Sequence, residues 1–302
     1  MNENSRTPEQ EREQEEAQFR ADFQVGGVDR TMTQEEQLEQ LYSYLDAHYE
    51  LPDFTPPWKG GAGDPDPADN YIARLGDRTT HAAMLMLGSG LDQSMPGNSW
   101  VEGIETEEVS EVGGRLFIPP EPTGKWGLSF HSGGWWRGSG DALEMAWRPE
   151  VAAAAMRSGT IILDVDYPLA PQHTLAEMND LVAQAVGVAQ HHNAVSIAGW
   201  GYSSGAALAA MNAQLFDALV LTFPDLASVA ALPDEIRAGA AIPAADTWPK
   251  TLVQIALQDE IAARPADVGA AEVVEYVSRH RVSTPEVARD KIADVAAFLR
   301  SV

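Results

Sequence analysis

The sequence predicts an α/β protein in which a mostly parallel β-sheet is covered by helices on both faces. From residue 126 onward, short apolar runs of strand length alternate with helical patterns. This alternation is typical of βαβ units, whose crossover connections place helices over the sheet. At 302 residues, the chain is long enough for one large domain with a sizeable core.

The expected elements of this sheet follow from the local patterns. We expect strands at residues 126–131, 160–165, 194–198, 219–223, 251–257 and 273–277. We expect helices at residues 151–157, 178–190, 204–211 and 285–299. Ligands of such sheets bind beyond the carboxyl ends of the strands, so functional residues are expected there.

The N-terminal part of the chain has a different character. Residues 1–21 are rich in Glu, Gln and Arg and nearly free of large apolar side chains, which indicates a disordered or frayed acidic tail. Residues 22–98 are expected to form a helical cap, and residues 99–302 the main α/β domain. The main domain begins with a hairpin-and-strand pattern over residues 99–119.

Within the expected cap, two helical segments flank a loop. Thr33 to Glu36 resembles an N-cap sequence, and apolar residues follow at helical spacing to Leu45. The Pro-, Gly- and Asp-rich run at 51–69 predicts a loop, and residues 71–87 predict a second helix.

Composition excludes several classes of site. The chain has no cysteine, so it can form neither disulfides nor thiolate metal sites. It has no apolar run long enough for a membrane span and no apolar N-terminal signal segment, so we expect a cytoplasmic protein. A net charge of −25 disfavours nucleic acid, anionic membranes and highly anionic substrates as partners.

The stretch around Ser203 predicts a catalytic nucleophile. Gly201-Tyr202-Ser203-Ser204-Gly205 fits the G-x-S-x-G pattern of a sharp turn between a strand and a helix. Such a turn requires small residues two positions before and after the nucleophile, because a Cβ there would collide with neighbouring backbone. Ser204 as nucleophile would place Tyr202 at one of these positions, so Ser203 is the better candidate.

A second candidate element follows the strand that begins at Trp126. His131-Ser132-Gly133-Gly134 places two successive glycines at a strand end, where their backbone N–H groups could stabilise an oxyanion. The N–H of Ser204, the residue after the nucleophile, is the other expected donor.

These motifs resemble those of a known family. His131 to Trp135 is similar to the H-G-G-G-[FW] motif of hormone-sensitive-lipase-like α/β hydrolases, and Asp166 to Pro171 to their D-Y-R-L-A-P motif. The segment around Ser203 resembles their G-D-S-A-G-G. The three motifs occur in the family's order, from about Val109 to the C-terminus. The resemblance implies the α/β-hydrolase fold and makes His131 a structural residue.

The chain departs from the family pattern at three motif positions. Ser132 replaces the first loop glycine, Pro168 the usual Arg, and Tyr202 the usual Asp. The segment 224–250 is short, so a cap must come mainly from the N-terminal part. The His-x-Gly-x-Trp sequence also resembles the corresponding loop of arylformamidases, which leaves the choice between ester and amide substrates open.

Chain order predicts the remaining two members of a catalytic triad. In this fold, the acid and then the histidine follow the serine, and His280 is the only one of seven histidines after Ser203. Asp259, two residues past the strand at 251–257, is the preferred acid. Glu260 is chemically competent, and Asp225 is a further alternative that could instead cap a turn.

The expected function is that of a serine carboxylesterase that cleaves small to medium uncharged esters through an acyl-enzyme. No metal or cofactor is expected, and the partner is a small-molecule substrate, with a homodimer compatible with the sequence. Amidase, formamidase or acyltransferase activity and a catalytically silent receptor are the alternatives. Four aromatic residues could line a substrate pocket or belong to the core: Trp135, Trp136, Trp200 and Tyr202.

Overall fold

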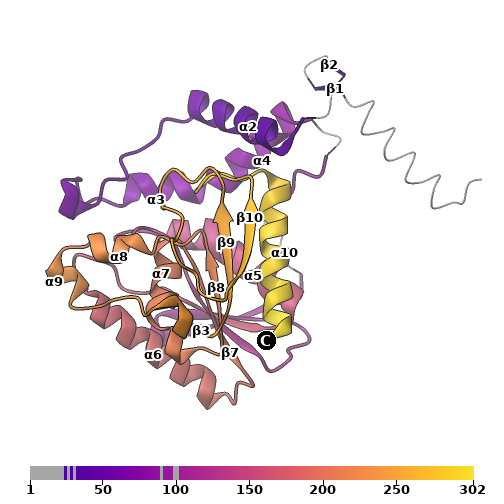
Figure 1. Cartoon of the computed structure of the whole chain (residues 1–302). Coiled ribbons are helices and arrows are strands. Elements are labelled where there is room, and N and C mark those ends of the chain that lie inside the picture. Colours follow the sequence, from indigo (N-terminus) through magenta and orange to yellow (C-terminus); the bar gives the residue numbers. More distant parts are fainter. Residues whose placement is uncertain (1–23, 26–27, 30–31, 89–90, 98–101) are drawn as a thin grey trace, which may run out of the picture.

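An eight-stranded β-sheet forms the centre of the chain in the computed structural model (Figure 1). The structure describes residues 24–25, 28–29, 32–88, 91–97 and 102–302, so the predicted tail at 1–21 lies outside the described residues. The strands of this sheet are β3 (Glu105–Val109), β4 (Gly114–Ile118), β5 (Trp126–Phe130), β6 (Ile161–Val165), β7 (Ile197–Tyr202), β8 (Ala218–Thr222), β9 (Lys250–Ala256) and β10 (Glu272–Tyr276). A separate antiparallel ribbon joins β1 (Gln24–Val25) and β2 (Val28–Asp29).

The sheet is mostly parallel, as predicted. Its strand order is β10-β9-β8-β7-β5-β6-β4-β3, and all neighbours from β10 to β6 pair in parallel. Only β4 and β3 run antiparallel to their neighbours, and they form the predicted hairpin. The inner strands β5 and β8 are buried along their whole length, because helices cover both of their faces.

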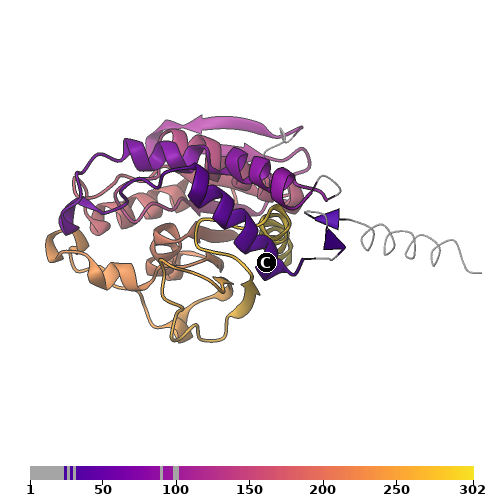
Figure 2. The ribbon, with the colours of Figure 1, turned by 90° about the horizontal axis from the view of Figure 1, so that it is seen from above.

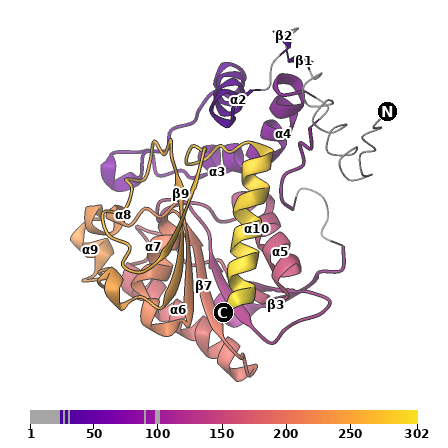
Figure 3. The ribbon, with the colours of Figure 1, turned by 45° about the vertical axis from the view of Figure 1, so that its right-hand side comes forward.

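Helices cover both faces of the sheet (Figure 3). The helices α5 (Arg148–Ser158) and α10 (Pro285–Ser301) pack against each other on one face. The helices α6 (Leu175–His191) and α7 (Ser204–Met211) lie on the other. Two short helices, α8 (Ala227–Ala231) and α9 (Asp234–Arg237), follow β8.

Three N-terminal helices lie across the carboxyl ends of the parallel strands (Figures 1 and 2). They are α2 (Gln34–His48), α3 (Asp66–Ala73) and α4 (Leu75–Met86). The predicted N-cap at Thr33 is confirmed, since its hydroxyl accepts the N–H of Glu36 and its own N–H donates to the Glu36 carboxylate. The buried face of α2 packs on α4 and on Val282 from the C-terminal part of the chain.

The boundaries of three predicted elements were wrong. The predicted strand at 194–198 begins only at Ile197 and continues to Tyr202, and Val195 is 74% exposed. The strand runs through two glycines, which weaken a strand signal in a sequence. Close packing nevertheless requires glycine at position 199, because an added Cβ there would lie 2.8 Å from the ring of Phe216.

The other two corrections concern the segment before the hairpin. The loop predicted to reach residue 69 ends earlier, because α3 begins at Asp66. Pro67 is tolerated in its first turn, where a backbone N–H would have no partner within the helix. The single helix predicted at 71–87 is two helices. They are separated at Arg74, whose N–H bonds to the carbonyl of Ile72.

Gly205 provides a direct test of the turn between β7 and α7. An added Cβ at this position would lie 2.2 Å from the carbonyl oxygen of Phe130. We therefore expect Gly205→Ala to lower the free energy of unfolding by about 3 kcal/mol or more, or to prevent folding. The matched control is Gly187→Ala on the exposed face of α6, where nothing lies within 4 Å of the added Cβ. The control should raise the free energy of unfolding by about 0.5–1 kcal/mol in urea titrations. Equal effects of the two variants would contradict this account of the turn.

Candidate active site

Ser203 lies at the tip of the sharp turn between β7 and α7. Its backbone is in a rare conformation, with φ 58° and ψ −117°. Gly201 and Gly205 flank it, and an added Cβ at Gly201 would lie 2.2 Å from the Gly205 backbone. The two glycines therefore let strand and helix approach closely enough to place the Ser203 side chain beyond the end of β7.

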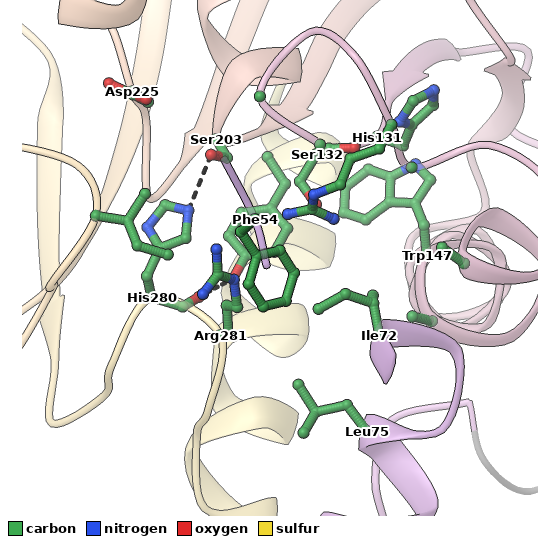
Figure 4. Close-up of a pocket in the computed structure, with 18 of the residues that line it drawn as sticks. Phe54, Ile72, Leu75, His131, Ser132, Trp147, Ser203, Asp225, His280 and Arg281 are labelled. Carbon is green, nitrogen blue, oxygen red and sulfur yellow. Dashed lines mark hydrogen bonds between the residues drawn. The ribbon is translucent and has the colours of Figure 1, made fainter. Parts of the chain in front are cut away.

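His280 lies against Ser203, although 77 residues separate them in the chain. The Nε2 atom of His280 is 2.9 Å from the Oγ of Ser203 (Figure 4). His280 lies in the loop after β10 and is 4% exposed. Its imidazole stacks at 5.5 Å on Tyr202, whose hydroxyl donates to the His280 carbonyl. Packing and this hydrogen bond hold the ring in place.

Asp259 completes a chain of three hydrogen-bonded side chains. Its Oδ2 lies 2.7 Å from the Nδ1 of His280, and its Oδ1 accepts the N–H groups of Ile261 and Ala262 at 2.8 and 2.7 Å. Burial raises the pKa of Asp259, but the hydrogen bond and charge of His280 and the two N–H groups outweigh this. The pKa therefore lies below its ordinary value, and the carboxyl group remains ionised near neutral pH.

The two alternative carboxylates hold different positions. Glu260 accepts the backbone N–H of His280 at 3.1 Å and does not contact the imidazole nitrogens. The backbone carbonyl of Asp225 accepts the hydroxyl of Ser228 at 2.6 Å, as in a turn. Burial raises the pKa of the Asp225 carboxyl group, which faces the cavity described below.

The loop after β5 that contains Gly133 and Gly134, called the glycine loop below, lies beside Ser203. Gly133 has φ +144° and Gly134 φ +61°, so both adopt conformations that favour glycine. The N–H of Gly134 donates to the buried hydroxyl of Ser204 at 3.0 Å. Ser204 is the first residue of α7, and its own N–H therefore has no partner within the helix.

Three residues that anchor this loop had not been assigned a role from the sequence. Tyr167 stacks on the buried His131 at 4.2 Å and donates its hydroxyl to the His131 carbonyl at 2.9 Å. Both carboxylate oxygens of Asp69 accept the N–H of Gly138 at 3.1 Å. Asp69 also pairs with Arg137 at 3.5 Å. Tyr167 could have been found from the Asp166–Pro171 motif, whereas nothing in the sequence marks Asp69.

A cavity of about 430 Å³ opens above Ser203 and His280. It is lined by the glycine loop and by side chains from the N-terminal helices, including Ile72 and Leu75 (Figure 4). Trp135, Trp136 and Tyr202 also line it. Trp200 does not, because it is buried in the core and donates to Thr222.

Two further properties bear on the chemistry of the described part of the chain. Its His, Asp and Glu side chains form no group of three or more that could hold a metal ion. None of the helices in the described ranges is long and apolar enough to cross a membrane.

Comparison with known proteins supports the fold. Residues 128–263 match a family model described as alpha/beta hydrolase fold. Three solved structures are similar over most of their length. A hormone-sensitive lipase from a metagenome library is 16% identical with a TM-score of 0.59, covering 90% of this chain and 99% of that one. An arylesterase is 16% identical with a TM-score of 0.58, covering 87% of this chain and 97% of that one. An esterase from Pyrobaculum calidifontis is 16% identical with a TM-score of 0.56, covering 79% and 93%.

At these identities the likeness establishes the fold. Together with the family match, it confirms the predicted resemblance to α/β hydrolases of the hormone-sensitive-lipase type. No curated protein matches the sequence.

The geometry predicts which carboxylate matters for turnover. Asp259→Asn removes the charge that faces the Nδ1 of His280, so we expect kcat to fall by about 10⁴-fold, as for the acid of serine proteases. The matched control Glu260→Gln alters only a contact to backbone and should cost about tenfold or less. Steady-state kinetics on a p-nitrophenyl ester measure both, and a larger loss for Glu260→Gln would exclude Asp259 as the acid.

Proposed function

Because this chain has the α/β-hydrolase fold, we propose that it is a serine carboxylesterase that cleaves small to medium carboxylic esters. The observation that carries the proposal is the continuous hydrogen-bonded chain from Ser203 through His280 to Asp259. A nucleophile, a base and an orienting carboxylate in this order provide what a two-step acyl transfer requires.

In the first step, the Oγ of Ser203 attacks the ester carbonyl and His280 takes its proton at Nε2. Asp259 holds the imidazole with Nδ1–H toward its carboxylate and stabilises the imidazolium that forms. His280 then returns the proton to the leaving alcohol, which departs and leaves an acyl-enzyme. Water enters, and the same base activates it to release the acid.

The backbone N–H groups of Gly133, Gly134 and Ser204 are the proposed oxyanion donors. Preorganised donors at the site of developing charge usually supply the largest single stabilisation of such transition states. The hydrogen bond from Gly134 to the Ser204 hydroxyl supports the assignment, because it fixes the loop against the N-terminus of α7. Gly134 would share its N–H between this hydroxyl and the oxyanion.

The proposed substrate size follows from the cavity. Its volume of about 430 Å³ falls in the range of small-molecule sites. The helices α2, α3 and α4 would serve as a cap, with Ile72 and Leu75 contacting the apolar part of the ester. The similar solved structures bear the names esterase, arylesterase and hormone-sensitive lipase, which favours an ester over an amide bond.

We expect Ser203→Ala to abolish hydrolysis of p-nitrophenyl esters without unfolding the protein, because only the nucleophilic oxygen is removed. A fluorophosphonate probe should label the wild-type protein at Ser203, as mapped by mass spectrometry of tryptic peptides. Labelling at Ser204 or Ser132 would overturn the assignment. An aryl formamide assayed beside the esters tests the amide alternative, and its faster turnover would replace the esterase proposal.

The pH profile gives an independent test. The pKa of Asp259 lies below its ordinary value of 3.8, so this group remains ionised as the pH falls from 8 to 5 and causes no loss of activity there. The base must be neutral to accept a proton, and imidazole titrates near pH 6.5 in model peptides. We therefore expect kcat/KM to fall on acidification well above pH 4, because the proposed base is an imidazole and not a carboxylate. A decline centred near pH 4 would instead implicate a carboxylate as the base.

A further inference from the structure

The charged residues around the cavity differ in sign from those of the chain as a whole. The chain has 45 acidic and 20 basic residues, not counting histidine. The side chains that line the cavity include four cations and two carboxylates: Lys59, Arg137, Arg281 and Lys291 against Glu150 and Asp225. The lining itself therefore has more cations than carboxylates, the reverse of the chain as a whole.

Two of these four cations form ion pairs with carboxylates. Lys291 is 5% exposed at its side chain and lies 3.3 Å from Glu150, and Arg137 lies 3.5 Å from Asp69. A third, Lys59, is exposed, and water competes for its charge. The fourth, Arg281, is half-buried and forms no ion pair with a carboxylate in the described ranges.

Within the described ranges, the charge of Arg281 is opposed by burial and supported by a carboxylate that is not in ion-pair contact with it. Burial lowers the pKa of Arg281, and the charge of Glu260 opposes this shift. Glu260 acts at a distance, since it forms no ion pair with Arg281, and one of its carboxylate oxygens accepts the backbone N–H of His280. Arg137 adds a repulsive positive charge, and its own pKa falls to about 10, mainly through burial. A guanidinium held in this way is stabilised by an anion that enters the cavity.

Phe54 holds the guanidinium in a defined orientation. The Cζ of Arg281 lies 3.7 Å from the centre of the Phe54 ring, and the Cζ of Arg137 lies 4.7 Å from the same ring. Figure 4 shows Arg281 between His280 and Phe54 at the cavity. Stacking occupies the flat face of a guanidinium and leaves its N–H edges available for bidentate hydrogen bonds, the geometry that matches a carboxylate.

We infer that Arg281 binds a carboxylate on the substrate, so that the preferred esters carry a carboxylate in addition to the ester bond. The inference rests on the proposed esterase function and specifies its substrate class. The net charge of −25 argued for uncharged esters, but a local field set by a few buried groups outweighs a screened charge spread over the surface. Since Arg281 directly follows His280, the carboxylate would bind next to the reacting carbonyl.

The test compares charged and neutral esters of similar shape by pH-stat titration. One pair is monomethyl glutarate against methyl valerate, in which the acyl part carries the carboxylate. The other is O-butyrylglycolate against propyl butyrate, in which the alcohol part carries it. For at least one pair we expect kcat/KM to be about tenfold or more higher for the charged ester at low salt, since a charge-assisted bidentate contact is worth that much. The preference should shrink as ionic strength rises.

Variants assign the preference to Arg281. In Arg281→Gln the ratio of charged to neutral kcat/KM should fall to about one or below, and Arg281→Lys should retain only part of it, because lysine lacks the planar fork. The matched control is Arg264→Gln. It also removes one positive charge, but from an exposed pair with Glu275 that does not line the cavity. Its ratio should remain that of the wild type.

A binding measurement tests this inference independently of the proposed function. In calorimetry, the Ser203→Ala protein should bind monomethyl glutarate more tightly than methyl valerate. The Ser203→Ala/Arg281→Gln protein should lose this difference in affinity. Neutral esters that are cleaved without any preference for the charged partner would overturn the inference and leave the esterase proposal standing. Selective binding without turnover of any ester in the wild type would overturn the esterase proposal and leave the Arg281 site standing.

Discussion

The absence of a Cβ at Gly201 and Gly205 is the constraint on which the site depends. A methyl group at Gly205 would lie 2.2 Å from the carbonyl oxygen of Phe130, and one at Gly201 would lie equally close to the Gly205 backbone. The turn therefore brings α7 directly against the end of β5, which leads into the glycine loop. One close approach thus places the proposed nucleophile and the proposed oxyanion donors side by side, while the strain at Ser203 is borne by the surrounding sheet.

The parallel sheet supplies the other groups from the same edge. Asp259 follows β9 and His280 follows β10, and both strands end on the side where β7 ends. Parallel pairing therefore gathers residues that lie 56 and 77 positions from Ser203 in the sequence into one hydrogen-bonded chain. The histidine needs only a short loop to reach the serine, and Tyr202 limits its movement by stacking on the ring.

How much of the fold and of the site could be predicted from the sequence depends on how far apart in the chain the interacting residues lie. The turn at Ser203 and the N-cap at Thr33 could be predicted because local spacing encodes them. The hydrogen-bonded grouping of Ser203, Asp259 and His280 could be predicted because the fold constrains the order of such residues along the chain. The anchoring of the glycine loop by Asp69 could not be predicted, since its contact to Gly138 spans 69 residues and depends on where α3 lies. The sequence could not show, for the same reason, that Arg281 has no ion-pair partner among the described residues, because pairing partners are set by packing. The limits of β7 were wrong because its glycines serve close packing, which local propensity does not reveal.

The N-terminal helices are joined to the site by more than their position above it. Val282 lies in one apolar cluster with Leu41 and Leu45 of α2 and with Leu87 after α4, only two residues beyond His280. On the other side of the histidine, Arg279 stacks at 3.6 Å on Tyr42 of α2.

The loop that carries His280 is thus held between the N-terminal helices and the sheet. A displacement of α2 would therefore act on the position of the imidazole as well as on access to the cavity. The same loop presents Arg281 to the cavity, so its packing bears on the orientation of the proposed base and of the proposed carboxylate-binding residue together.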